Sequence, residues 1–112
     1  MNKFELFTII YFWLDKFYEN TTDDKIIGHL SEMNPFLWKE PVSADPAVYD
    51  EYCRFIQDKK ITIENSLSLA KEYAATIQYA DITEAFEDAD DREWKEGLEK
   101  YLAMEHKGAE IS

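Results

Sequence analysis

The amino-acid sequence predicts a single all-α domain, a compact bundle of about five helices. Apolar side chains recur at spacings of three and four residues along most of the chain, which is the period of an amphipathic helix. Prolines and capping residues separate these stretches, and no turn signal joins two alternating runs into a β-hairpin. A chain of 112 residues, 46% of them hydrophobic, is long and apolar enough to form one domain with its own core.

The first helix is predicted over residues 4–18, where the apolar side chains cover a wide arc. An arc of this width is typical of a central helix that contacts several others. Thr8 falls on the side assigned to solvent, and Phe12 stands among the polar positions. A second helix is predicted over residues 23–33, with Thr21 and Thr22 as its candidate caps, and Thr21 and Asp24 have the spacing of a capping box.

Asn34-Pro35 ends the second helix, since the residue before a proline is forced out of the helical conformation. Residues 34–45 contain two prolines and no clear period, which predicts a structured loop. Asp45-Pro46 has the pattern of an N-cap followed by the first helical residue, and the third helix is expected to reach about Lys59. Thr62 is the predicted cap of a fourth helix that continues to about Tyr79.

The last helical region, one helix or a pair, is predicted to open at a capping box of Asp81 and Glu84 and to reach about His106. Its expected core-facing side chains are Phe86, Trp94, Leu98, Tyr101 and Leu102. Lys107-Gly108 is expected to end it, with residues 107–112 as a frayed tail. No linker divides the sequence, so residues 1–112 are interpreted as one domain.

Net charge, the length of the apolar run and the cysteine count each argue against particular classes of function. Twelve Lys and Arg against 24 Asp and Glu give a net charge of −12, which disfavours binding to nucleic acid or to an anionic membrane. The longest uncharged apolar stretch, residues 6–14, is too short to span a bilayer and lacks a signal-peptide cleavage site. A single cysteine cannot form an internal disulfide bond. Together these features predict a cytoplasmic protein.

No complete catalytic motif is present, so we expect neither an enzyme, nor a bound metal, nor a cofactor. His29 and His106 form no ligand pair and are expected at the surface, while Cys53 is expected to be buried or half-buried. Asp88 to Glu93 lacks the glycine and the third oxygen ligand of a calcium-binding loop.

Pairs of glutamates raise one enzymatic alternative, a metal-dependent all-α nucleotide hydrolase. Glu84-x-x-Glu87, Glu93-x-x-Glu96 and Glu96-x-x-Glu99 each place two carboxylates on one helical face. Such hydrolases carry E-x-x-E on one helix and E-x-x-D on the next. In this sequence the second pair is E-x-x-E, and it follows so soon that we expect it on the same helix as the first.

The densest signal is acidic. Residues 81–93 hold seven carboxylates and one arginine, a net charge of 1 − 7 = −6. This run is interpreted either as a solvated helix start, where acidic side chains favour the positive end of the dipole, or as a contact surface for a basic protein. The candidate contact residues are Glu84, Glu87, Asp88, Asp90 and Asp91.

The loop that holds Phe36, Leu37 and Trp38 is the second informative segment. Three large apolar side chains on an irregular segment either fold back as a lid on the core or stay exposed as anchors for a partner. Phe36 and Trp38 are the candidate anchors.

Residues 30–38 (LSEMNPFLW) followed by residues 43–49 (SADPAVY) resemble small acidic helical proteins of bacteria, mostly uncharacterised, some of which are similar to immunity or antitoxin proteins. The resemblance covers residues 30–55. It implies a cytoplasmic protein that works by occluding a basic toxin domain, such as a nuclease. Our first hypothesis is therefore a non-enzymatic binding protein of the immunity or antitoxin type. The alternative from another class is a homo-oligomeric structural or regulatory protein that pairs through its aromatic first helix.

Overall fold

The computed structural model describes residues 1–78 and 80–103, and within these ranges it contains six helices and no strand. The helices are α1 (Lys3–Phe17), α2 (Asp24–Met33), α3 (Pro46–Ile56), α4 (Ser66–Thr76), α5 (Glu84–Glu87) and α6 (Asp91–Leu102). The predicted all-α fold is confirmed. The helix count exceeds the predicted five because the last helical region forms two separate helices.

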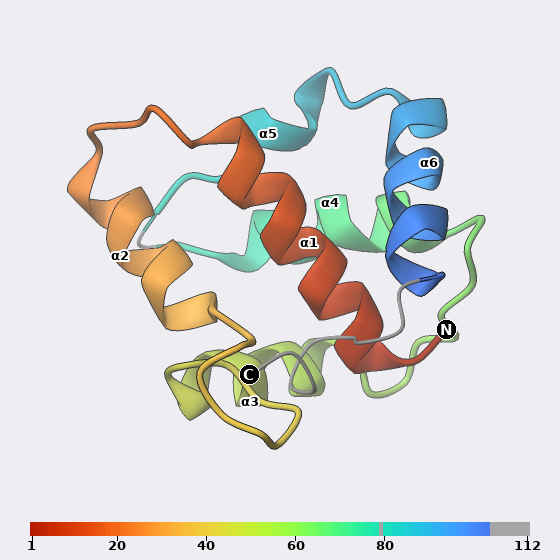
Figure 1. Cartoon of the computed structure of the whole chain (residues 1–112), viewed down its shortest axis with the longest axis horizontal. Coiled ribbons are helices and arrows are strands. Elements are labelled where there is room, and N and C mark those ends of the chain that lie inside the picture. Colours follow the sequence, from red (N-terminus) through yellow and green to blue (C-terminus); the bar gives the residue numbers. More distant parts are fainter. Residues whose placement is uncertain (79, 104–112) are drawn as a thin grey trace.

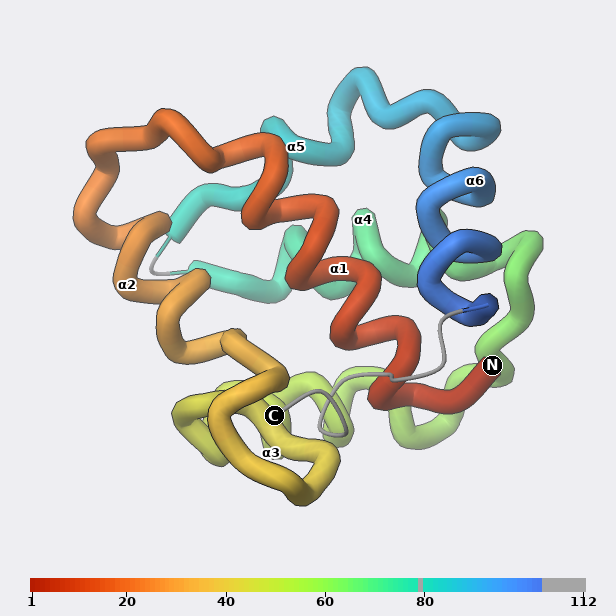
Figure 2. Tube along the Cα trace, viewed as in Figure 1, coloured from red at the N-terminus to blue at the C-terminus, as the bar shows by residue number. Residues whose placement is uncertain are grey.

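Helix α1 is the centre of the molecule. It crosses the middle of the view in Figure 1, and each of the other five helices contacts it. The tube in Figure 2 shows the chain passing around α1, from α2 through α3 and α4 to α5 and α6. Leu6, Phe7, Ile10 and Leu14 are completely buried between these neighbours. The prediction of a central first helix is confirmed, and most of its apolar face packs inside the molecule.

Local hydrogen bonds explain where the helices start. At α1, Asn2 and Glu5 form a capping box, in which the Glu5 N–H donates to Asn2 Oδ1 over 2.8 Å and the Asn2 N–H donates to Glu5 Oε1 over 2.9 Å. At α3, Asp45 is the N-cap as predicted, since its Oδ1 accepts from the Ala47 N–H over 3.0 Å, and Pro46 begins the helix.

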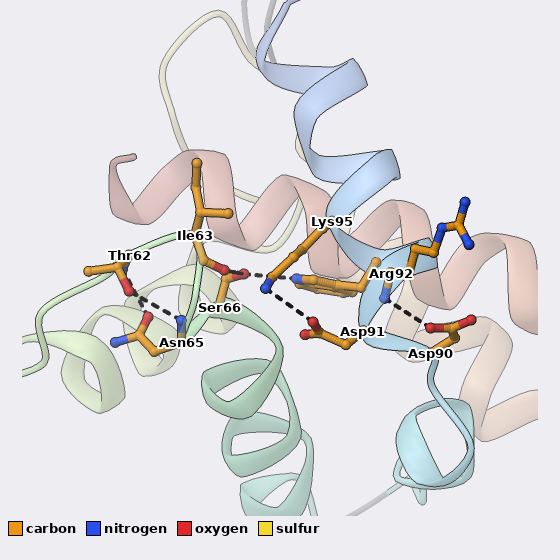
Figure 3. Close-up of polar contacts among 9 residues, drawn as sticks. Thr62, Ile63, Asn65, Ser66, Asp90, Asp91, Arg92 and Lys95 are labelled. Carbon is orange, nitrogen blue, oxygen red and sulfur yellow. Dashed lines mark hydrogen bonds and ion pairs between the residues drawn. The ribbon is translucent and has the colours of Figure 1, made fainter.

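The predicted caps of α2 and α4 are wrong. Asp23, rather than Thr21, is the N-cap of α2, because its carboxylate accepts from the backbone N–H groups of Lys25 and Ile26. Helix α4 begins at Ser66, after the predicted start at Thr62. Thr62 instead exchanges two hydrogen bonds with Asn65 in the preceding turn (Figure 3), over 2.8 and 3.1 Å.

Helix ends also differ from the predictions. Helix α3 stops at Ile56 rather than near Lys59, whose N–H closes a turn by donating to the Ile56 carbonyl over 2.9 Å. Helix α4 ends at Thr76. Tyr79, His106 and the tail 107–112 lie outside the described residues.

Three predictions of exposure are corrected. Thr8 is fully buried, and it satisfies its hydroxyl by donating to the Phe4 carbonyl over 2.9 Å. His29 is only 1% exposed, because it lies on the inward stripe of α2 with Ile26, Leu30 and Met33. Phe17, expected in the apolar stripe of the first helix, is half exposed in its last turn.

The other predicted core positions agree with the structure. Phe86, Trp94, Leu98 and Tyr101 are buried, Leu102 is half-buried, and Cys53 is half-buried as expected. None of the described helices has both the length and the apolar character needed to cross a bilayer.

Candidate functional site

The five acidic candidates lie together where the chain leaves α5 and enters α6, at the top of the view in Figure 1. All five side chains are exposed. We call this group the acidic corner, and its members are Glu84, Glu87, Asp88, Asp90 and Asp91.

A single helical turn positions the first half of the corner. The predicted capping box of Asp81 and Glu84 is absent, because Asp81 Oδ1 accepts from the N–H and the hydroxyl of Thr83, over 3.1 and 2.7 Å. Thr83 is the N-cap of α5, without a side-chain capping bond. The two bonds from Thr83 lower the pKa of Asp81, so its carboxylate stays ionised and adds negative charge beside the corner.

The buried side of α5 fixes the corner to the central helix. Ala85 and Phe86 are buried, and the indole Nε1 of Trp13 on α1 donates to the Ala85 carbonyl over 2.8 Å. The Phe86 ring packs beside two tryptophan rings, with its centroid 6.5 Å from that of Trp13 and 6.2 Å from that of Trp94. The carboxylates therefore project from an anchored turn.

Asp90 and Asp91 have roles in α6 itself (Figure 3). Asp90 is the N-cap, with its Oδ1 accepting from the Arg92 N–H over 2.9 Å. Asp91 Oδ2 forms an ion pair with Lys95 Nζ over 3.1 Å, one turn along the helix. These contacts agree with the interpretation of the acidic run as a helix start.

Buried hydrogen bonds also hold helix α6 in place. The buried Trp94 indole donates to the Ser66 hydroxyl over 2.8 Å, and that hydroxyl donates to the Ile63 carbonyl over 2.8 Å. This chain of bonds joins α6 to the first residue of α4. The position of the Asp90 and Asp91 side chains is thus set by buried as well as exposed contacts.

The remaining three carboxylates have no such role. Glu84, Glu87 and Asp88 make no hydrogen bond through their side chains and no ion pair with another described residue. The charges of Glu84 and Glu87 act on Tyr18, the C-cap of α1. Burial raises the pKa of the Tyr18 hydroxyl, and the nearby charge of Glu84 raises it further. Like charges at this spacing repel, and this repulsion lowers the stability of the folded chain.

The glutamate pairs lie on two helices, which corrects the prediction that they share one. Glu84 and Glu87 form α5, whereas Glu93, Glu96 and Glu99 lie on α6. Among the described residues, no group of three or more His, Cys, Asp or Glu side chains gathers as a metal site would require.

The aromatic loop combines both predicted arrangements. Phe36 is half-buried and packs on α1, with its ring centroid 5.5 Å from that of Phe12. Leu37 and Trp38 are 59% and 45% exposed, although the Trp38 indole donates to the Ala44 carbonyl over 3.3 Å. One side chain of the loop is therefore folded back, and two face solvent.

The structure does not bring the loop and the acidic corner together. In Figure 1 the yellow loop after α2 lies at the bottom, and the cyan segment between α5 and α6 lies at the top. Phe36 contacts Phe12, which in turn contacts Tyr101 near the end of α6, over 5.8 Å between ring centroids. The corner lies at the other end of that helix, about 15 Å away at a rise of about 1.5 Å per residue.

A groove between α1 and α6 was missed by the sequence reasoning. Phe12 and Trp13 line it from α1, and Gly97 and Tyr101 line it from α6. The sequence signal was Phe12, an apolar side chain among polar positions. We call this cavity the α1–α6 groove.

Comparison with family models, curated proteins and solved structures finds no match for this chain. The resemblance of residues 30–55 to immunity and antitoxin proteins therefore stays a prediction.

Proposed function

We propose that this protein is a non-enzymatic binding protein of the immunity or antitoxin type, which uses its acidic corner to occlude a basic surface of a partner protein. The observation that carries the proposal is the exposure of five carboxylates along the anchored turn of α5 and the start of α6. The side chains of three of them, Glu84, Glu87 and Asp88, have no hydrogen bond or ion pair to another described residue.

The charge makes a basic protein the natural partner. Residues 81–93 carry a net charge of −6, in a chain whose net charge is −12. Opposite potentials steer two proteins together and speed their association, most strongly at low salt. A toxin that acts on nucleic acid needs a cationic cleft for phosphate, and such a cleft would complement this corner. A protein of this kind would meet its partner in the cytoplasm.

The partner contact is expected to extend beyond the corner. A stable protein interface covers about 800 Å² on each partner, a patch roughly 30 Å wide. Trp38, at the other end of the molecule, is our candidate for a peripheral apolar contact. Phe36 holds the loop against α1 through its contact with Phe12.

A pull-down from the native host tests the proposal. The tagged chain is washed at low and then at high salt, and the bound proteins are identified by mass spectrometry. The test variant carries Glu84→Lys, Glu87→Lys and Asp88→Lys, which removes charge without touching the Asp90 cap or the ion pair of Asp91.

The control variant carries Glu51→Lys, Asp58→Lys and Glu72→Lys. These three side chains are also exposed and lie outside the corner. Both variants change the net charge equally, from −12 to −6. We expect the wild-type chain to capture one basic protein, which elutes at high salt and whose activity the wild-type chain inhibits. The control variant should capture this protein as well, and the corner variant should not. Equal capture by both variants would count against the acidic corner.

A further inference from the structure

The α1–α6 groove has the dimensions of a small-molecule site. It encloses about 430 Å³, and ligand pockets typically measure about 300–1,000 Å³. Its aromatic lining consists of Phe12, Trp13, Trp94 and Tyr101. The rings meet in pairs across the helices, with centroids 5.8 Å apart for Phe12 and Tyr101 and 5.4 Å apart for Trp13 and Trp94. Such a lining suits an apolar ligand body.

Gly97 keeps the groove open. It lies in the interior of α6, where glycine is less favourable than alanine. A Cβ atom added at Gly97 would meet no heavy atom within 4 Å, so packing against the described residues does not require glycine here. A side chain at this position would instead extend into the groove.

The charges at the groove are the reverse of those of the molecule as a whole. Lys16 from α1 and Lys100 from α6 line it together with Glu93, a sum of +1 in a chain of net charge −12. Neither lysine forms an ion pair with another described residue. The net positive charge beside an aromatic lining complements a ligand that has an apolar body and an anionic group.

We propose that the α1–α6 groove binds a small amphipathic organic anion, a carboxylate attached to an apolar body. The aromatic rings contact the body, and Lys16 and Lys100 supply the positive charge for the carboxylate. The site is separate from the acidic corner, and it does not depend on the proposed inhibitor function.

Tryptophan fluorescence provides a direct test. The chain has three tryptophans, and Trp38→Phe leaves the two that line the groove as reporters. The probes are decanoate and 2-naphthoate, which distinguish an alkyl from an aryl body. Decanol and decyltrimethylammonium are the neutral and cationic controls, all kept below micelle formation. We expect saturable binding of at least one carboxylate, at least about tenfold tighter than either control.

Variants locate the site. Gly97→Leu fills the groove and should weaken carboxylate binding by at least about tenfold. Gly28→Leu is its matched control, because Gly28 also lies within a helix, with no atom within 4 Å of an added Cβ, and it does not line the groove. Lys16→Gln and Lys100→Gln should each weaken binding by about three- to tenfold, whereas Lys71→Gln on α4 should not. Glu93→Gln should tighten it.

Three results would overturn the proposal: no saturable binding of either carboxylate, equal binding of decanol, or unchanged binding by Gly97→Leu. Circular dichroism checks the fold of each variant. If Gly97→Leu does not fold, the double variant Lys16→Gln and Lys100→Gln, at two exposed positions, tests the site instead. Wild-type affinity for the carboxylates in that variant would contradict the proposal.

Discussion

The indole of Trp13, on the central helix, donates a hydrogen bond to the carbonyl oxygen of Ala85 over 2.8 Å. The two residues are 72 positions apart in the sequence. This bond and the contact of the Trp13 ring with Phe86 hold the single turn of α5 against α1. The acidic corner is therefore presented by a fixed turn.

Removal of this bond should loosen the corner. Trp13→Phe keeps an aromatic ring beside Phe86 and loses the indole N–H, so we expect a loss of about 1 kcal/mol in the free energy of unfolding. Amide hydrogen exchange should accelerate in residues 83–90 more than in α3. Unchanged exchange in that segment would show that the bond does not hold the turn.

The corner residues should differ in their effect on stability. Asp90→Ala removes the N-cap of α6 and should cost about 1 kcal/mol, whereas Asp90→Asn keeps a capping oxygen and should cost less. Asp88→Ala is the matched control, and it should be neutral or slightly stabilising because it relieves repulsion. Urea unfolding of the three variants measures this order. Equal destabilisation by Asp88→Ala and Asp90→Ala would contradict the assigned roles.

His29 should make stability depend on pH. Burial lowers its pKa from 6.5 to about 4, so the folded state keeps the neutral form where the unfolded chain takes up a proton. Stability contributed by neutral His29 is complete above pH 6.5 and is lost as the pH falls toward 4. The expected loss between pH 7 and pH 5 is about 2 kcal/mol.

Urea unfolding at pH 7 and pH 5 tests this expectation by comparing the wild type with His29→Gln. The carboxylates titrate in both proteins, so the difference between their pH slopes isolates the histidine. The variant should lose less stability than the wild type on acidification. Identical slopes would show that His29 is not held neutral by burial.

Much of the fold followed from local signals. The first three helices begin within one residue of their predicted starts, because Pro46 and the apolar periods act over a few positions. The sequence did not decide whether the last helical region is one helix or two, and so it did not place the break between α5 and α6. Its signal is Asp90, an N-cap residue within the charged run, with Glu93 at the spacing of a capping box.

Burial was harder to predict, because it depends on contacts far along the chain. Thr8 is polar by type, yet it bonds to its own helix and can face the core. His29 stands at helical spacing with the apolar Ile26, Leu30 and Met33, and it is buried with them where α2 packs on α1. Its residue type, rather than its position, led to the expectation of exposure. The α1–α6 groove could not be predicted from local patterns. Phe12 and Gly97 both line it, and only the tertiary packing brings these residues together.

The central claim, docking through the acidic corner, is tested most directly by the association rate with the captured partner. Stopped-flow measurements at about 50 mM and about 500 mM salt compare the wild type with the two triple lysine variants. We predict that the Glu84, Glu87 and Asp88 variant associates at least about tenfold more slowly at low salt, and nearly as fast as the wild type at high salt. The Glu51, Asp58 and Glu72 variant should stay close to the wild type. Equal slowing of both variants, or no slowing of either, would contradict the claim.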